Sequence, residues 1–198
     1  MRNLIVCNIM SLDGYYTGLS NNVMVLPMDK SFDAYNLERL KAADTVLLGG
    51  TSYRMFGSFW PGVAGNPDAS PTNREFSKLY NNLVKVVVSD QMTPEDVAEA
   101  WRDTTRIVRR RNAHEEIAAL KLERGRDIVM FGSHTLWNDL LMHGLVDQLH
   151  LMIGPVVLGA GTPIFDGQPS VSLQLGDTRT WNDSGNVLVR YDVRRQET

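Results

Sequence analysis

The same short pattern occurs twice in this chain: an apolar run of strand length ends in glycine, and hydroxyl-bearing residues then open a helical pattern. The first copy is Val46-Leu47-Leu48-Gly49-Gly50-Thr51-Ser52, and the second is Ile128-Val129-Met130-Phe131-Gly132-Ser133-His134-Thr135. Buried strands that pass through tight turns into helices are the building units of α/β folds. The repeated pattern therefore predicts a central sheet covered by helices.

The rest of the chain continues this alternation. We expect strands over residues 2–10, 45–48, 84–88, 105–108, 127–131 and 146–153, and helices over 30–42, from 51 to 56, and over 74–83, 112–122 and 134–142. Thr93-Pro94-Glu95-Asp96 has the composition of a further helix start. Residues 57–73, rich in Gly, Pro, Asn and Ser, are expected to form a long surface loop.

Two late strand patterns make the predicted sheet mixed. The runs 171–180 and 187–194 flank Asn182-Asp183-Ser184-Gly185, which is typical of an antiparallel hairpin. The expected fold is a three-layer α/β domain over residues 1–198, with a mostly parallel mixed sheet flanked by helices and closed by a C-terminal hairpin.

The net charge and the lengths of the apolar runs argue against a nucleic-acid-binding protein and against a membrane protein. The net charge is −3, whereas a general nucleic-acid binder is usually basic. The one basic run, Arg109-Arg110-Arg111, either meets a phosphate or is a solvated strand end, and we favour the solvated end. No apolar run approaches the ~20 residues of a membrane span, and the chain starts directly in a strand pattern. We expect a cytoplasmic protein that binds neither nucleic acid nor membrane.

The glycine turns are candidate phosphate sites. A helix N-terminus presents unpaired N–H groups and a partial positive charge, and glycine lets the backbone approach a bound anion. A glycine followed by Ser or Thr is also an ordinary helix cap. Two such turns at the ends of neighbouring strands could hold a diphosphate between them.

Other catalytic motifs are absent from the sequence. There is no Gly-x-x-x-x-Gly-Lys-Ser/Thr loop and no Gly-x-Ser-x-Gly elbow. Cys7 lies in an apolar run and is expected to be a small buried hydrophobe. The four histidines lack zinc-type spacing, so we expect no metal site and place His134 at a helix start.

A third feature closes the first predicted strand. Ser11-Leu12-Asp13-Gly14 is a turn signal, but it also places a carboxylate at the carboxyl end of a strand. Ligands of α/β sheets bind at this edge, where Asp13 could orient or protonate a substrate.

The ordered set of motifs resembles the dihydrofolate reductase-like superfamily. It consists of Ser11-Leu12-Asp13-Gly14, Val46 to Tyr53, Val86-Val87-Val88-Ser89 and Phe131-Gly132-Ser133. The tail, Leu145 to Leu149 followed by Ile153 to Phe165, is similar to the branch of the riboflavin-biosynthesis reductase domain, the RibD C-terminal domain.

This resemblance implies an NADPH-dependent reductase of a pterin- or pyrimidine-type substrate. It implies that the cofactor is held on one side by Gly49, Gly50, Thr51 and Ser52, and on the other by Gly132, Ser133, His134 and Thr135. Ser89 and Arg109 would approach the 2′-phosphate, and Ile9 and Met10 would border the nicotinamide. Relatives pair through sheet and hairpin surfaces, so we expect a homodimer acting on a small molecule.

Two further positions bear on the substrate. Counting back from Gly49 places Asp33 where dihydrofolate reductase carries its acid, although acids on exposed helix faces are common. The same counting from Ser89 places Leu83 where the folate enzyme has an arginine, and without it a folate carboxylate loses its bidentate partner. Besides the riboflavin-type reductase, a true dihydrofolate reductase and a non-catalytic nucleotide-binding relative stay open.

Overall fold

The computed structural model describes residues 1–167 and 170–194. An eight-stranded sheet has the order β5-β4-β3-β6-β1-β7-β10-β9. Its strands are β1 (Leu4–Ser11), β3 (Ala43–Gly49), β4 (Val84–Val88), β5 (Thr105–Val108), β6 (Asp127–Phe131), β7 (Gln148–Gly154), β9 (Ser172–Trp181) and β10 (Ser184–Arg194). The strands from β5 to β7 in this order are parallel, and β10 pairs antiparallel with both β7 and β9. The predicted mostly parallel α/β sheet with a C-terminal hairpin is confirmed.

In the described residues, five α-helices and five short 3₁₀ turns connect the strands. The helices are α1 (Lys30–Ala42), α2 (Gly50–Val63), α3 (Pro71–Asn82), α4 (Ala113–Leu122) and α5 (His134–Met142). The 3₁₀ turns are η1 (Leu19–Asn21), η2 (Val23–Val25), η3 (Pro94–Asp96), η4 (Glu99–Thr104) and η5 (Arg110–Asn112). A second, two-stranded sheet pairs β2 (Tyr15–Thr17) with β8 (Thr162–Pro163).

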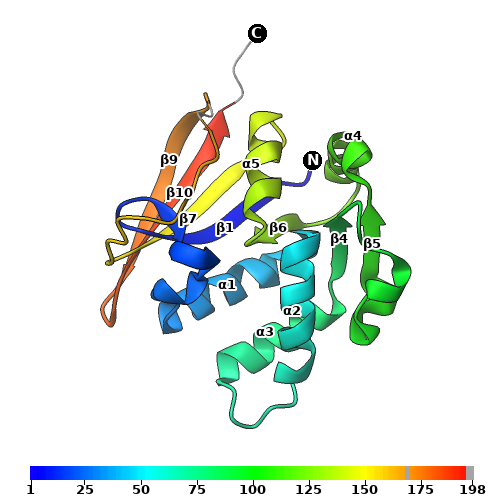
Figure 1. Ribbon diagram of the computed structural model, residues 1–198, viewed down its shortest axis with the longest axis horizontal. Coiled ribbons are helices and arrows are strands. Elements are labelled where there is room, and N and C mark those ends of the chain that lie inside the picture. Colours follow the sequence, from blue (N-terminus) through cyan, green and yellow to red (C-terminus); the bar gives the residue numbers. More distant parts are fainter. Residues whose placement is uncertain (168–169, 195–198) are drawn as a thin grey trace.

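The alternation of side chains along the strands divides the helices between the two faces of the sheet. Leu4 and Val6 of β1 pack in one apolar cluster with α4 and α5, whereas Ile5 and Cys7 pack in another with α1, α2 and α3. In Figure 1, α4 and α5 accordingly lie in the upper part of the picture and α1, α2 and α3 in the lower part. The sheet is therefore the middle of three layers.

The predicted surface loop over residues 57–73 is wrong. Helix α2 continues to Val63 and α3 already begins at Pro71. An aromatic contact holds this corner: the rings of Trp60 and Phe76 have centroids 4.4 Å apart. The Ser77 hydroxyl also donates to the Trp60 carbonyl at 2.6 Å. Helix packing thus overrides the local glycine and proline content, and Pro61 lies in the last turn of α2.

The predicted helix start at Thr93 is realised only as a single turn. The capping box between Thr93 and Asp96 forms, but η3 ends at Asp96. The following segment reaches η4, where Trp101 is fully buried against the α2–α3 side of the sheet.

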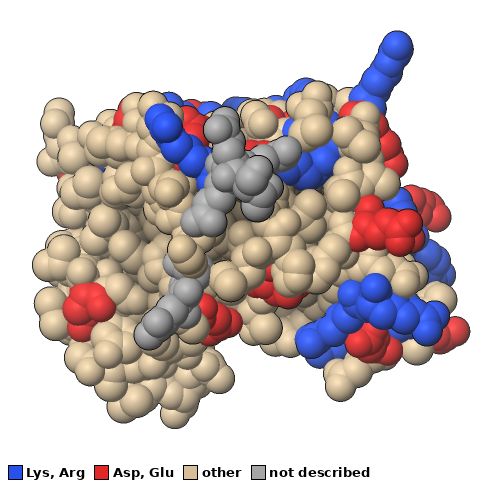
Figure 2. All heavy atoms as spheres, turned by 90° about the horizontal axis from the view of Figure 1, so that it is seen from above, with Lys and Arg blue, Asp and Glu red and all other residues tan. Residues whose placement is uncertain are grey.

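Charged side chains are mixed on the face seen in Figure 2. Lys and Arg lie beside Asp and Glu there, mainly toward the right of the view, and the left part is mostly uncharged. Among the helices that the structure describes, none combines the length and the apolar character required to cross a bilayer.

His150 is a titratable group buried in the central sheet. It lies on β7, where Tyr35 shares a hydrogen bond with its Nδ1 at 2.7 Å and Gln148 Oε1 lies 3.1 Å from its Nε2. Burial lowers the pKa of His150 to about 3. The imidazole therefore stays neutral in the folded protein at pH values where it is protonated in the unfolded chain.

We expect this group to make the folded protein less stable in mild acid. Between the usual pKa of 6.5 and a folded pKa of about 3, only the unfolded chain takes up the proton, so the free energy of unfolding falls as the pH falls. The contribution is at most about 1.4 kcal/mol per pH unit. Urea denaturation over this range should show a smaller loss for His150→Gln than for the wild type, and an equal loss would contradict the assignment.

Candidate functional site

The two glycine turns reach the edge of the sheet side by side and are hydrogen-bonded to each other. The register pairs Val46 of β3 with Val129 of β6, and Gly49 and Gly132 lie the same number of residues further on. The Gly49 N–H donates to Ser133 Oγ at 3.0 Å, and the Ser133 N–H donates to Ser52 Oγ at 2.9 Å. The first turns of α2 and α5 are therefore held together at one point.

The second turn has an unusual backbone that makes this connection possible. Gly132 and Ser133 are both left-handed, with φ values of 62° and 54°. The left-handed region is costly for residues other than glycine, so Ser133 is held there by its surroundings. Its hydroxyl serves Gly49 of the other turn and does not cap α5.

A cavity of about 670 Å³ opens beside the joined turns. Seven of the predicted cofactor residues line it: Gly49, Gly50, Thr51, Ser52, Ser133, His134 and Thr135. The rest of the wall is formed by Tyr16, Thr17, Asn21, Val23, Met55, Val88, Arg110, Ala113, His114, Leu136, Asp139 and Thr162. The cavity thus lies between α2, α4, α5 and the small β2–β8 sheet.

Side-chain caps are present on the α-helices away from the cavity and absent from those that line it. Asp29 caps α1 and Ser70 caps α3. The N-cap residues of α2, α4 and α5 (Gly49, Asn112 and Ser133) make no side-chain cap. Uncapped first turns leave N–H donors and the positive end of the helix dipole available to an anion. Helix α4 continues from η5, so α2 and α5 are the better donors.

Gly50 is a position where a side chain does not fit. A Cβ atom there would lie 2.8 Å from the Ser89 hydroxyl and 3.1 Å from Ser89 Cβ. Ser89 is itself fixed, because its hydroxyl accepts the N–H groups of Gln91 and Met92 at 3.2 and 3.1 Å. Ser89 therefore shapes the start of α2 from beneath, and it does not line the cavity.

The basic run divides its side chains between two tasks. Nη1 of Arg109 donates to the carbonyls of Ser89, Asp90 and Met92 at 2.9 to 3.1 Å, so Arg109 braces the loop after β4. Arg110 is the residue that lines the cavity. The predicted role of Arg109 at the 2′-phosphate stays a prediction.

Tyr16 and His134 form a stacked pair on the wall of the cavity. Their ring centroids lie 4.8 Å apart, and His134 Nε2 lies 2.8 Å from the Pro163 carbonyl. Burial raises the pKa of Tyr16 to about 12, so its hydroxyl stays protonated and can donate a hydrogen bond near neutral pH.

Ile9 and Met10, predicted to border the nicotinamide, do not line the cavity, and neither do the predicted catalytic acids Asp13 and Asp33. Ile9 is buried in the apolar cluster around Leu26, and Met10 packs against the α4–α5 cluster. Gly132 lies directly behind Ser133 and donates its N–H to Asn8 Oδ1 at 3.0 Å.

Asp13 holds a loop. Its carboxylate accepts the N–H groups of Leu158 and Gly159, the latter at 2.7 Å. The Ser11 hydroxyl and these N–H groups lower the pKa of Asp13 to about 2. A carboxylate that stays ionised in this way is poorly suited to donate a proton. Its predicted catalytic role remains a prediction.

Asp33 lies half-buried on α1. Burial raises its pKa, while Asn73 Nδ2 donates to its carboxylate at 3.0 Å. A raised pKa favours the protonated form that a general acid needs. The structure places Asp33 away from the cavity wall, and its catalytic role also stays a prediction.

The sequence from residue 2 to residue 189 matches the RibD C-terminal domain. The chain belongs to this family. The mostly parallel sheet and the C-terminal hairpin agree with the resemblance drawn from the motifs.

Known relatives of this RibD C-terminal domain span nearly the whole chain. YyaP of Bacillus subtilis (strain 168), an uncharacterized protein, is 32% identical over 193 residues, which is 96% of this chain and 94% of YyaP.

Two solved structures show the same fold. The deaminase/5-amino-6-(5-phosphoribosylamino)uracil reductase of Thermotoga maritima has a TM-score of 0.67 at 12% identity, over 98% of this chain and 57% of that one. The dihydrofolate reductase of Enterococcus faecalis, solved with NADP(H), has a TM-score of 0.58 at 15% identity, over 98% and 97%.

Several wall residues of this RibD C-terminal domain had no distinct signal in the sequence. Tyr16, Asn21 and Met55 come from segments that carry no motif of their own, whereas Thr162 belongs to the tail that resembles the family. Arg110 did have a signal, the basic run after β5, which we interpreted as solvated. Arg110 lines the cavity, and a phosphate contact of this run stays a prediction.

The bond between the turns can be tested through Ser133. Ser133→Ala removes the acceptor of the Gly49 N–H but keeps a left-handed residue with a Cβ, whereas Ser133→Gly removes the acceptor and the backbone cost. We expect Ser133→Ala to lower the free energy of unfolding by about 1–3 kcal/mol, and Ser133→Gly to lower it less. Urea denaturation measures both, and an unchanged Ser133→Ala would disprove the bond's importance.

Proposed function

We propose that the protein is an NADPH-dependent reductase that transfers a hydride to a pyrimidine- or pterin-type substrate, as in riboflavin biosynthesis. The observation that carries this proposal is the meeting of the uncapped N-termini of α2 and α5 at one cavity, joined through Ser52 and Ser133. Two converging sets of N–H donors fit a diphosphate better than a single phosphate.

The residues of the cavity match the parts of such a cofactor. The first turns of α2 and α5 would hold the diphosphate, and the missing Cβ at Gly50 lets the first turn of α2 pack on Ser89 in the position that this requires. Arg110, which lines the cavity beside Val88, would pair with the 2′-phosphate through a charge-assisted hydrogen bond. The bound cofactor would supply the hydride, and the chain would supply position and charge.

The opposite wall of the cavity would hold the nicotinamide end of the cofactor and the substrate. Tyr16, Thr17 and Asn21 line the cavity from the β2–β8 side, and the neutral Tyr16 hydroxyl is available as a donor. The name of the Thermotoga relative gives a uracil reductase, which supports a pyrimidine substrate here. A dihydrofolate reductase is less well supported, because Leu83 packs against the α1–α3 side of the sheet and provides no cation.

The proposal includes a homodimer formed through the hairpin. β9 is the edge of the sheet, and its Leu173 and Leu175 side chains are 37% and 53% exposed. An exposed strand edge invites pairing with a second copy. Light scattering should report twice the chain mass, and a monomer at micromolar concentration would remove this part of the proposal.

Gly50 offers a direct test of the proposed NADPH binding. Gly50→Ala should weaken NADPH binding at least about tenfold, because the added Cβ displaces Ser89 and intrudes at the helix start. Gly62→Ala is the matched control, since Gly62 lies on the same helix with nothing within 4 Å of its Cβ position. Fluorescence titration gives both affinities. Equal binding by the two variants would contradict the assignment, as would a wild type that does not bind NADPH at sub-millimolar concentration.

Arg110 tests the recognition of the 2′-phosphate. Arg110→Ala should raise the Kd for NADPH about tenfold and leave that for NADH nearly unchanged, since only NADPH carries the extra phosphate. Arg111→Ala, an exposed neighbour outside the cavity wall, should change neither. Equal losses for both cofactors would show that Arg110 has another role.

The reaction itself is tested by NADPH consumption. Oxidation of NADPH with the 5-amino-6-(5-phosphoribosylamino) uracil substrate, and none with dihydrofolate, would support the proposal. Turnover of dihydrofolate alone would replace it with the folate reductase. Tight cofactor binding without turnover of either substrate would indicate a non-catalytic nucleotide-binding protein.

A further inference from the structure

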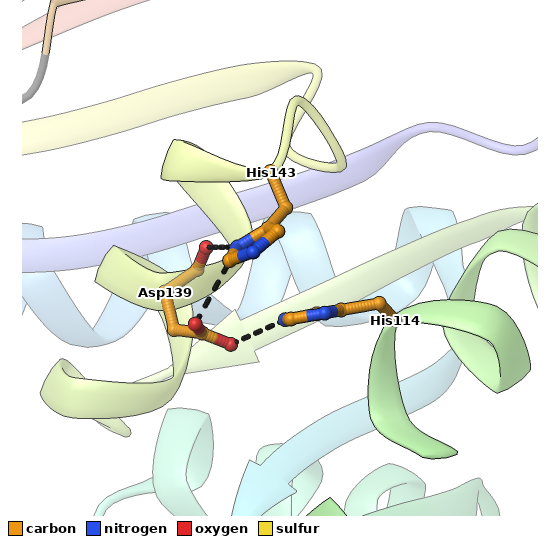
Figure 3. Close-up of side chains that lie close together, drawn as sticks. All are labelled: His114, Asp139 and His143. Carbon is orange, nitrogen blue, oxygen red and sulfur yellow. Dashed lines mark hydrogen bonds and ion pairs between the residues drawn. The ribbon is translucent and has the colours of Figure 1, made fainter. Parts of the chain in front are cut away.

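Three side chains gather where α4 and α5 meet, at the border of the cavity. Nε2 of His114 lies 2.7 Å from Asp139 Oδ2, and Nδ1 of His143 lies 3.5 Å from Asp139 Oδ1. Figure 3 shows the Asp139 carboxylate facing both imidazoles. One ligand atom from each residue can be chosen so that all lie within 4.8 Å of one another.

The fold brings these residues together from two helices. Asp139 and His143 are four residues apart at the end of α5, so they lie on the same side of that helix. His114 projects from the first turn of α4, and its ring stacks on that of His143 with centroids 3.7 Å apart. This separation in the chain explains why the spacing of the histidines predicted no metal site.

We propose that His114, Asp139 and His143 bind a divalent transition-metal ion, for which Zn²⁺ is the representative probe. Two imidazoles and one carboxylate are a ligand set that Zn²⁺ and its neighbours accept, whereas Mg²⁺ and Ca²⁺ prefer oxygen ligands. The ion would replace the contact between His114 Nε2 and Asp139 Oδ2. The stacked imidazoles must turn so that a nitrogen of each points at the same ion, and the roughly half-exposed positions of the three side chains leave room for this.

The local contacts also orient the ligands. His143 Nδ1 donates to the Asp139 backbone carbonyl at 2.8 Å, which fixes the ring at the end of α5. Hydrogen bonds of this kind orient the ligands of metal sites.

The bound ion would be accessible from the cavity. His114 and Asp139 line the cavity, whereas His143 lies outside its wall. The remaining coordination positions of the ion would therefore be reachable from the cavity by water or by an anionic oxygen. The proposal does not depend on the identity of the cofactor, because all three ligands belong to the chain.

Metal binding can be measured on the purified full chain without any cofactor. Competition with a chromophoric chelator gives the Zn²⁺ affinity, and Co²⁺ absorption reports nitrogen and oxygen ligands. Removing a ligand should weaken binding by at least about tenfold, since even loss of a ligand's hydrogen-bond partner costs that much. We expect this loss in His114→Ala, His143→Ala and Asp139→Asn.

Glu115→Gln is the matched control. Glu115 is an exposed acid beside His114 on α4 that is not part of the cluster, so its variant should bind Zn²⁺ like the wild type. Unchanged Zn²⁺ affinity in His114→Ala and Asp139→Asn, or a wild type that binds Mg²⁺ as tightly as Zn²⁺, would overturn the proposal. Circular dichroism confirms that each variant is folded. Because His114 lies on α4 and Asp139 on α5, a variant of one helix still tests the proposal if a variant of the other does not fold.

Discussion

The site depends on the two hydrogen bonds that join the turns after β3 and β6. Ser133 accepts from Gly49 and donates its own N–H to Ser52, so each helix start is fixed by the other. Gly49, the N-cap residue of α2, has no side chain, and the Ser133 hydroxyl at the N-cap of α5 is taken by Gly49, so neither helix carries a side-chain cap. The same contacts that stabilise the edge of the sheet therefore leave helix N–H donors free for an anion.

Most of the fold could be predicted from local patterns. The strands around Val86, Ile107 and Val129 and the helix from Lys30 to Ala42 have the predicted bounds or nearly so, because each has an apolar periodicity that matches its burial. The segment 57–73 was mispredicted as a loop. Its helical ends depend on Trp60 packing against Phe76, a contact between two helices that no local pattern reports.

The candidate site was predictable where a motif shapes the backbone. Seven residues of the two glycine turns line the cavity, because glycine and hydroxyl residues at a strand end set the backbone locally. Arg109 and Arg110 could not be told apart, because their tasks depend on the loop carbonyls that follow β4. The cluster of His114 with Asp139 was equally hidden, since its members come from different helices.

The β2–β8 pair has a consequence for the order in which the protein can form during synthesis. One wall of the cavity combines residues near Tyr16 with Thr162, and Asp13 is bonded to Leu158 and Gly159. Contacts so distant along the chain require both segments to be present, and they carry a large loop-closure cost. A nascent chain can assemble both glycine turns once Ser133 has left the ribosome, but it cannot enclose a ligand until the segment through Pro163 has emerged.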